Sequence, residues 1–220
     1  MNLEDDKRGE SLRVSDEPGH ITALMRDPAN AVTLAGLGFA VAGLHASVVG
    51  EVHLGAACLA LALFADMTDG WVARRSGPRR AAHMSRAGMQ LDSIADLMHG
   101  AILPAALMGA LSDWSAISLL LSVLLALCAA TRLTYFSVFG GNPDGSYRGV
   151  PVIYTSFLTS LLIGLLPMPF AAQVLPWCIA TIAVFNVSSL RVPKMTGGGL
   201  AAFNLLSVGV VVLNLLKSIT

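Results

Sequence analysis

The sequence has little charge and no excess of either sign. Only 13% of its 220 residues are charged, about half the fraction in an average soluble domain, and 14 basic residues balance 14 acidic ones. This balance excludes a basic nucleic-acid binder, and a disordered or acidic-tail protein would need a charge excess or low hydrophobicity. Because 55% of the chain is hydrophobic and only 6% aromatic, the composition instead indicates a polytopic membrane protein.

Cysteine is also scarce. Cys58, Cys128 and Cys178 are isolated within apolar stretches, and the chain has neither a CxxC pair nor the Cys/His spacing of a zinc site. We therefore expect the three thiols to pack as small hydrophobic side chains. For His83 and His99 we expect a loop or helix-packing role, with a chemical role as the alternative.

Long apolar stretches follow a polar start. Residues 1–27 resemble neither a signal peptide nor a transit peptide, and we expect a polar tail ending in a short interfacial helix near 20–26 that Pro28 terminates. The rest, 28–220, forms one transmembrane domain. Its apolar stretches are 30–49, 52–74, 88–110, 114–138, 150–166, 169–188 and 198–217, of which the fifth is short. Open strand edges cannot be satisfied in lipid, so we predict an all-α transmembrane bundle of about six to seven spans.

The basic residues predict an orientation. If these stretches are crossed in turn, thirteen of the fourteen fall on the side of the N-terminus, and only Lys217 falls on the other. The thirteen are Lys7, Arg8, Arg13, Arg26, Arg74, Arg75, Arg79, Arg80, Arg86, Arg132, Arg148, Arg191 and Lys194. Because basic residues favour cytoplasmic loops, we expect the N-terminus to face the cytoplasm of a bacterial-type inner membrane.

Four acidic residues lie inside the second and third spans: Asp66, Asp69, Asp92 and Asp96. A carboxylate at membrane depth costs about 3 kcal/mol or more, so such residues face a cavity or a partner and mark functional sites. The first two are three residues apart and the last two are four apart, so each pair shares one helix face. At about 1.5 Å per residue, both pairs lie roughly 6 to 12 Å below the predicted cytoplasmic ends of their helices.

Four carboxylates this close cannot all stay ionised without cations. Hard oxygen ligands suit Mg²⁺ or Mn²⁺, which are usually bound together with the phosphates of a substrate. Gly70 and Ala73 leave space beside the aspartates, and the planar guanidinium of Arg74 suits phosphate oxygens. The pattern predicts a metal-dependent phosphate site, with a proton or cation pathway as the alternative.

These residues resemble a known family. Asp66, Asp69, Gly70, Ala73 and Arg74, followed by Gly88, Asp92 and Asp96, are similar to the signature D-x2-D-G-x2-A-R…G-x3-D-x3-D of the CDP-alcohol phosphotransferases. Members are integral membrane enzymes that transfer a phosphatidyl or similar group from a CDP-linked lipid to an alcohol and release CMP. The 13 residues between Arg74 and Gly88 exceed the usual spacing, so we expect a lengthened cytoplasmic loop over 75–87.

Shorter segments resemble the phosphatidylserine synthase branch of that family. They are LDSIADLMHGAILPA at 91–105, RLTYF at 132–136, YRGVP at 147–151 and RVPK at 191–194, and NAVT at 30–33 fits the family as a whole. His99 departs from the pattern, because it stands where an aromatic residue is expected.

The resemblance implies a reaction and roles for residues. CDP-diacylglycerol would donate a phosphatidyl group to L-serine in phospholipid biosynthesis. Asp66, Asp69 and Asp92 would hold one or two Mg²⁺ or Mn²⁺ ions, and Asp96 would complete the metal cluster and act as general base on the serine hydroxyl. The CDP-lipid would contact Asp66, Asp69, Gly70, Ala73, Arg74 and Gly88. A homodimer is also implied, and small residues at Gly36, Ala40 and Gly43 predict a packing face within the bundle or between subunits.

A zwitterionic acceptor needs a cation for its carboxylate. Arg132, Arg148, Arg191 and Lys194 lie on the same predicted side of the membrane as the aspartates. They are candidates for acceptor binding, although ordinary loop charges that attract anionic lipid headgroups are the alternative. Glycerol 3-phosphate or an inositol phosphate would also favour these cations, so other acceptors remain open.

Two other classes of protein are less consistent with the pattern. A transporter should show internal repeats and interrupted helices in both halves, whereas all four membrane-depth acids lie within 31 residues. A non-catalytic membrane scaffold would not need them at all.

Overall fold

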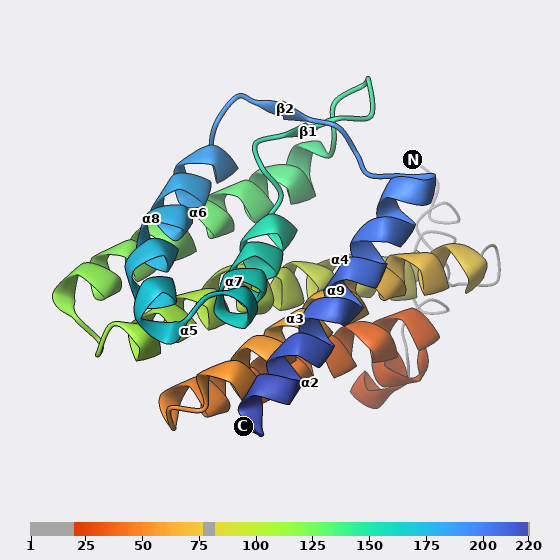
Figure 1. Cartoon of the computed structure of the whole chain (residues 1–220). Helices are drawn as coiled ribbons and strands as arrows, with labels where there is room; N and C mark the ends of the chain where they lie inside the picture. Colours follow the sequence, from red (N-terminus) through yellow and green to blue (C-terminus); the bar gives the residue numbers. More distant parts are fainter. Residues whose placement is uncertain (1–19, 77–81, 220) are drawn as a thin grey trace, which may run out of the picture.

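The computed structural model describes residues 20–76 and 82–219, and the regular secondary structure of this part is helical apart from two very short strands (Figure 1). The all-α bundle is therefore confirmed. Six helical segments are long and apolar enough to cross a membrane. Residues 1–19 of the predicted tail and 77–81 of the predicted loop lie outside the described residues. The other residues of that loop, 75–76 and 82–87, are helical, so the predicted loop over 75–87 is wrong in its extent.

The bundle starts with a helix break at Pro28. The short 3₁₀ helix η1 (Ile21–Arg26) lies where the interfacial helix was predicted, and α2 (Pro28–Val48) follows. Proline suits the first turn of a helix because its missing N–H needs no partner there. The Asp27 side chain caps α2 by accepting a hydrogen bond from the backbone N–H of Asn30 at 3.0 Å.

Small residues let α2 pack closely against α3 (Val52–Ser76). A Cβ atom on Gly36 would lie 3.0 Å from the Cβ of Ala65, and one on Gly43 would lie 2.9 Å from the Cβ of Cys58. Ala40 is fully buried between them. The predicted small-residue face therefore packs within the bundle, and a homodimer, which stays a prediction, would have to use another surface.

The third span is one continuous helical segment with a local change of pitch. It consists of α4 (Ala82–Leu97), the π-helical turn η3 (Met98–Ile102) and α5 (Leu103–Leu111). Pro104 is the second residue after the π turn, and its lack of an N–H removes one ordinary helical hydrogen bond. The Leu103 N–H bonds instead to the carbonyl of Met98, five residues back. Such π turns often occur at functional sites, and this one contains His99.

The second half of the chain adds α6 (Ala116–Phe139), α7 (Ile153–Leu165), α8 (Met168–Asn186) and α9 (Gly197–Ser218). Each of the seven predicted apolar stretches thus corresponds to helical structure. The fifth, α7, has 13 residues and spans about 20 Å, less than the roughly 30 Å of a hydrocarbon core.

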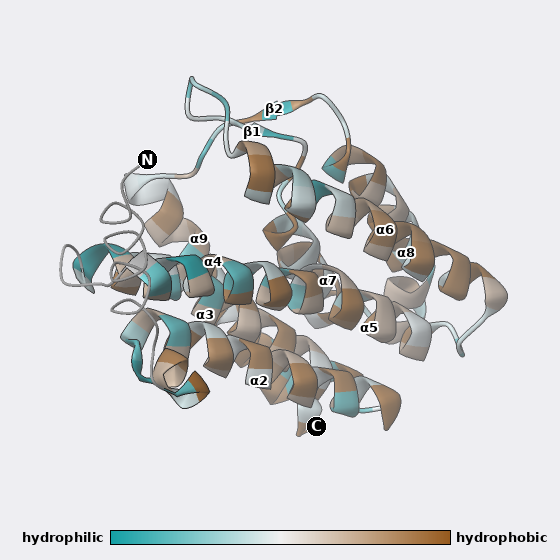
Figure 2. Ribbon diagram, turned by 180° about the vertical axis from the view of Figure 1, so that it is seen from behind, coloured by the Kyte–Doolittle hydropathy of each residue, from teal (hydrophilic) through white to brown (hydrophobic). Residues whose placement is uncertain are grey.

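A two-stranded strap fixes the ends of these helices. Strand β1 (Tyr147–Arg148) pairs antiparallel with β2 (Arg191–Val192), so the start of α7 and the end of α8 lie at the same end of the bundle. Figure 1 shows the strap running across that end toward the start of α9. In Figure 2 hydrophilic residues gather on the first half of α4 and on the strap, whereas α6 and α8 are mostly hydrophobic.

Candidate active site

The four membrane-depth aspartates meet where α3 lies against α4. Oxygen atoms of Asp66, Asp69 and Asp92 all lie within 4.8 Å of one another. Asp66 also belongs to a second group with Asp96 and His99, whose ligand atoms are equally close together. The helical spacing within each pair turns both pairs toward one another, as the sequence predicted.

The first group fits a divalent cation. Oxygen ligands lie about 2.0 to 2.6 Å from Mg²⁺ or Ca²⁺, so two ligands of one ion are separated by at most about 4 to 5 Å. The three carboxylates Asp66, Asp69 and Asp92 satisfy that limit. Because like charges in a poorly hydrated site repel, a cation bound here would offset the repulsion between the three carboxylates.

Asp69 is held by a residue from another helix. Its side chain is only 7% exposed, and the hydroxyl of Thr33 on α2 donates a hydrogen bond to it. Thr33 ends the NAVT segment, whose fit to the family gave no indication of this contact. A hydrogen bond to a carboxylate fixes its orientation, so α2 helps to position Asp69 among the clustered carboxylates.

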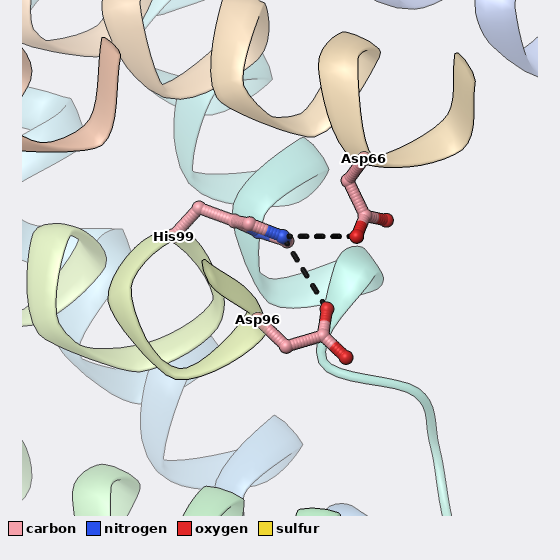
Figure 3. Close-up of side chains that lie close together, drawn as sticks. All are labelled: Asp66, Asp96 and His99. Atoms are coloured by element: carbon pink, nitrogen blue, oxygen red, sulfur yellow. Dashed lines mark ion pairs between the residues drawn. The ribbon is translucent and has the colours of Figure 1, made fainter. Parts of the chain in front are cut away.

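Sequence reasoning missed the place of His99. The imidazole is 1% exposed, and its Nε2 atom lies 3.3 Å from Asp96 Oδ1 and 3.7 Å from Asp66 Oδ1 (Figure 3). The expected helix-packing role thus leaves out its contact with two of the four carboxylates. Two signals pointed to it: His99 follows Asp96 by three residues, on the same helix face, and it replaces an expected aromatic side chain.

The aspartates line a cavity of about 570 Å³. Residues of α3, α4, α6, β1 and the segment after β2 line it, among them Asp66, Asp69, Asp92, Asp96, Gly70, Arg74, Arg132, Tyr147 and Lys194. A smaller hollow of about 160 Å³ adjoins Asp69 and Asp92 and is lined also by Gly70, Ala73 and Gly88. Every residue predicted to contact the CDP-lipid therefore lines one or both of these spaces.

The four predicted acceptor-binding cations fall into two pairs. Arg132 and Lys194 line the cavity. Arg148 donates a hydrogen bond to the Tyr135 hydroxyl at 3.2 Å, and neither it nor Arg191 is among the described residues that line the cavity. The structure thus brings only one of the two pairs to the aspartates.

Arg191 instead contributes to the outer surface of the strap. Its Nη1 atom lies 3.4 Å from Asp144, and both side chains are exposed. Hydrogen bonds from Ser146 hold the pKa of Asp144 below its ordinary value, so this carboxylate stays charged. An exposed pair of this kind contributes little stability, and it holds the Arg191 side chain away from the cavity.

Arg132 is the more unusual cation of the pair in the cavity. Its side chain is only 8% exposed, its guanidinium lies 5.9 Å from the Phe136 ring centroid, and its Nε has no hydrogen-bond partner among the described residues. Burial raises the pKa of the neighbouring Tyr147 phenol, which therefore remains a neutral hydrogen-bond donor. A buried guanidinium with an unused N–H is suited to an anionic group of a substrate.

Comparison with known proteins agrees with this arrangement. The CDP-alcohol phosphatidyltransferase family matches residues 27–216. The archaetidylserine synthase of Methanothermobacter thermautotrophicus is 28% identical over 155 residues, which cover 70% of this chain and 64% of that protein. The alignment thus spans less than two thirds of the relative. The predicted family is confirmed, and this chain belongs to the CDP-alcohol phosphatidyltransferases.

Proposed function

We propose that this protein transfers a phosphatidyl group from CDP-diacylglycerol to L-serine, forming phosphatidylserine and releasing CMP. The observation that carries the proposal is the convergence of four aspartates on a cavity that also contains the buried Arg132. Family membership supports phosphatidyl transfer, and the name of the archaetidylserine synthase supports serine as the acceptor.

The aspartates divide the chemistry between them. Asp66, Asp69 and Asp92 would hold one or two Mg²⁺ or Mn²⁺ ions, with Asp96 completing the set. Bound cations would offset the negative charge of the pyrophosphate and of the departing CMP. Asp96 would accept the serine hydroxyl proton while the serine oxygen bonds to the β-phosphorus and the bond from that phosphorus to CMP breaks.

Recognition of the acceptor falls to the two cations that line the cavity. The guanidinium of Arg132 offers a planar, charged donor for the serine carboxylate. Lys194 is exposed and lines the cavity from the segment after β2, where it suits either the carboxylate or a lipid phosphate. Gly70, Ala73 and Gly88 leave room for the nucleotide beside Asp69.

The location of the cavity supports a cytoplasmic active site. It lies where the C-terminal part of α3, which carries Arg74, approaches the strap, and basic residues are enriched on the cytoplasmic side of inner membranes. The proposed orientation therefore gives the enzyme direct access to soluble serine and releases CMP into the cytoplasm.

The test is acceptor-dependent release of CMP by the full chain in detergent or nanodiscs. CDP-diacylglycerol is supplied with L-serine, glycerol 3-phosphate or an inositol phosphate in turn, in the presence of Mg²⁺ or Mn²⁺. A parallel series uses a CDP-linked archaetidyl lipid, since that group appears in the name of the relative. We expect release with serine; release with another acceptor alone would contradict the serine assignment.

A pair of variants connects that activity to the site. Asp96→Asn should abolish serine-dependent CMP release while the protein still inserts into membranes. Asp113→Asn is the matched control, because Asp113 is an exposed residue in the turn between α5 and α6. Full activity of Asp96→Asn would remove Asp96 from the mechanism, and CMP release without any acceptor would indicate hydrolysis instead of transfer.

A further inference from the structure

The hydrogen bonds around His99 determine which of its ring nitrogens is left to face the aspartates. The Ser156 hydroxyl on α7 donates to the backbone carbonyl of His99 at 2.9 Å and also lies 2.9 Å from His99 Nδ1. A hydroxyl has a single proton, so Ser156 accepts at its second contact and Nδ1 is the donor. With Nδ1 as the donor, Nε2 is the ring nitrogen left to bind a cation, and it faces Asp66 and Asp96.

The distances around Nε2 fit ligands of a common cation better than direct hydrogen bonds. A charge-assisted N–H···O bond is about 2.7 to 2.9 Å long, whereas these separations are 3.3 and 3.7 Å. Neither Nε2 nor Asp96 Oδ1 has an aligned hydrogen-bond partner among the described residues, although both atoms are buried. Two ligands about 2.1 Å from one ion stand about 3.0 to 3.7 Å apart at ordinary coordination angles.

The surroundings of His99 also match a metal-binding histidine. Such residues usually donate their other ring N–H to a neighbouring acceptor that fixes the ring orientation, and Ser156 occupies that position. The π turn at Met98–Ile102 carries the ring, and the imidazole is 1% exposed. Figure 3 shows Nε2 directed between the two carboxylates, one from α3 and one from α4.

We propose that His99 Nε2 is itself a metal ligand. With Asp66 and Asp96 it forms a second cation site beside the site of Asp66, Asp69 and Asp92, and Asp66 is shared by both. The nitrogen ligand favours Mn²⁺ over Mg²⁺ at this second site, because imidazole suits transition metals whereas Mg²⁺ strongly prefers oxygen. The inference rests on the metal-dependent function proposed above and specifies the chemistry of its metal centre.

Pulsed electron paramagnetic resonance of bound Mn²⁺ tests this without turnover. The full chain, with any affinity tag removed, is loaded with Mn²⁺ in nanodiscs and examined for modulation by a coordinated ¹⁴N nucleus. We expect ¹⁴N modulation in the wild type, and its replacement by ¹⁵N modulation when histidine is ¹⁵N-labelled. His99→Asp should retain two bound Mn²⁺ ions per chain but lose the nitrogen signal.

Two controls assign the signal to this residue. His53→Gln removes another half-buried helical histidine, whose Nδ1 lies 3.3 Å from Asn214 Oδ1, and should leave the modulation unchanged. A chain in which His20, His45, His53 and His83 are all replaced should also keep it, so the assignment does not depend on how well the His99 variants fold. Ser156→Ala should weaken Mn²⁺ binding at this site about ten-fold through loss of the partner of Nδ1.

Three results would overturn the proposal: Mn²⁺ bound by the wild type without nitrogen modulation, modulation that persists in His99→Asp, or no Mn²⁺ binding at all. CMP release by the wild type without nitrogen modulation would reject this inference and leave the proposed transfer intact. Nitrogen modulation in a protein that transfers nothing to serine would reject the proposed transfer and leave the metal-binding role of His99 intact.

Discussion

Replacing Arg132 by glutamine tests how the acceptor is recognised. The side chain is buried in the cavity, and its Nε lacks a partner in the described part of the chain, so an anionic substrate group can use it. In Arg132→Gln the serine carboxylate would lose the guanidinium. Because that carboxylate does not react, its binding is the same in the ground and transition states, and the change should appear in the KM for serine.

The size of the effect follows from the contacts that are lost. A hydrogen bond to a charged group contributes about 1.5 to 3 kcal/mol, and a planar guanidinium can make two of them to one carboxylate. Losing about 3 kcal/mol corresponds to a rise of about 100-fold in the KM for serine, at 1.4 kcal/mol for each factor of ten. Arg132→Lys keeps the positive charge but not the two coplanar N–H donors, so we expect a rise of about ten-fold in the KM for serine.

Steady-state CMP release at varied serine and fixed saturating CDP-lipid measures this change. Arg148→Gln is the matched control, because Arg148 is an exposed arginine that contacts Tyr135 outside the cavity, and its KM for serine should match that of the wild type. An unchanged KM for serine in Arg132→Gln would refute the assignment. Equal losses in both variants would show that general positive charge, and not a bound carboxylate, is responsible.

Three further outcomes follow from the fold and the metal site. Gly149→Ala should lower the thermal unfolding temperature markedly, because Gly149 has φ +72° and an added Cβ would lie 2.1 Å from the last carbonyl oxygen of α8. Gly198→Ala adds a Cβ into open space and should leave the unfolding temperature nearly unchanged. Thr33→Val should raise the Mn²⁺ concentration needed for half-maximal activity about ten-fold, since Asp69 loses its hydrogen bond, and Thr131→Val, at an exposed site, should not. Chelation should abolish CMP release and added Mn²⁺ or Mg²⁺ should restore it; activity that survives chelation would contradict metal dependence.

Much of the site could be predicted because it depends on local spacing. Asp66 and Asp69 share one helix face, as do Asp92 and Asp96, and hydrophobic length places both helices in a membrane. These regularities depend only on helical periodicity within a single stretch of chain. The clustering of all four carboxylates was therefore predictable before any contact between helices was known.

Contacts between distant parts of the chain could not be predicted in this way. Thr33 reaches Asp69 across 36 positions, and Ser156 reaches His99 across 57. Small polar residues of this kind are common in apolar helices, and no spacing rule identifies their partners. Likewise the four basic residues proposed for the acceptor looked equivalent by charge. Only the structure showed that Arg132 lines the cavity whereas Arg191 pairs with Asp144 on the strap.

The most direct test of the proposed function follows the acceptor into the product. The purified chain is incubated with CDP-diacylglycerol, Mn²⁺ and isotopically labelled L-serine, and both lipid-extractable label and CMP are measured. Transfer to serine predicts labelled lipid and CMP in equal molar amounts, with neither formed by Asp96→Asn. CMP formed without labelled lipid, or labelled lipid formed equally well by that variant, would contradict it.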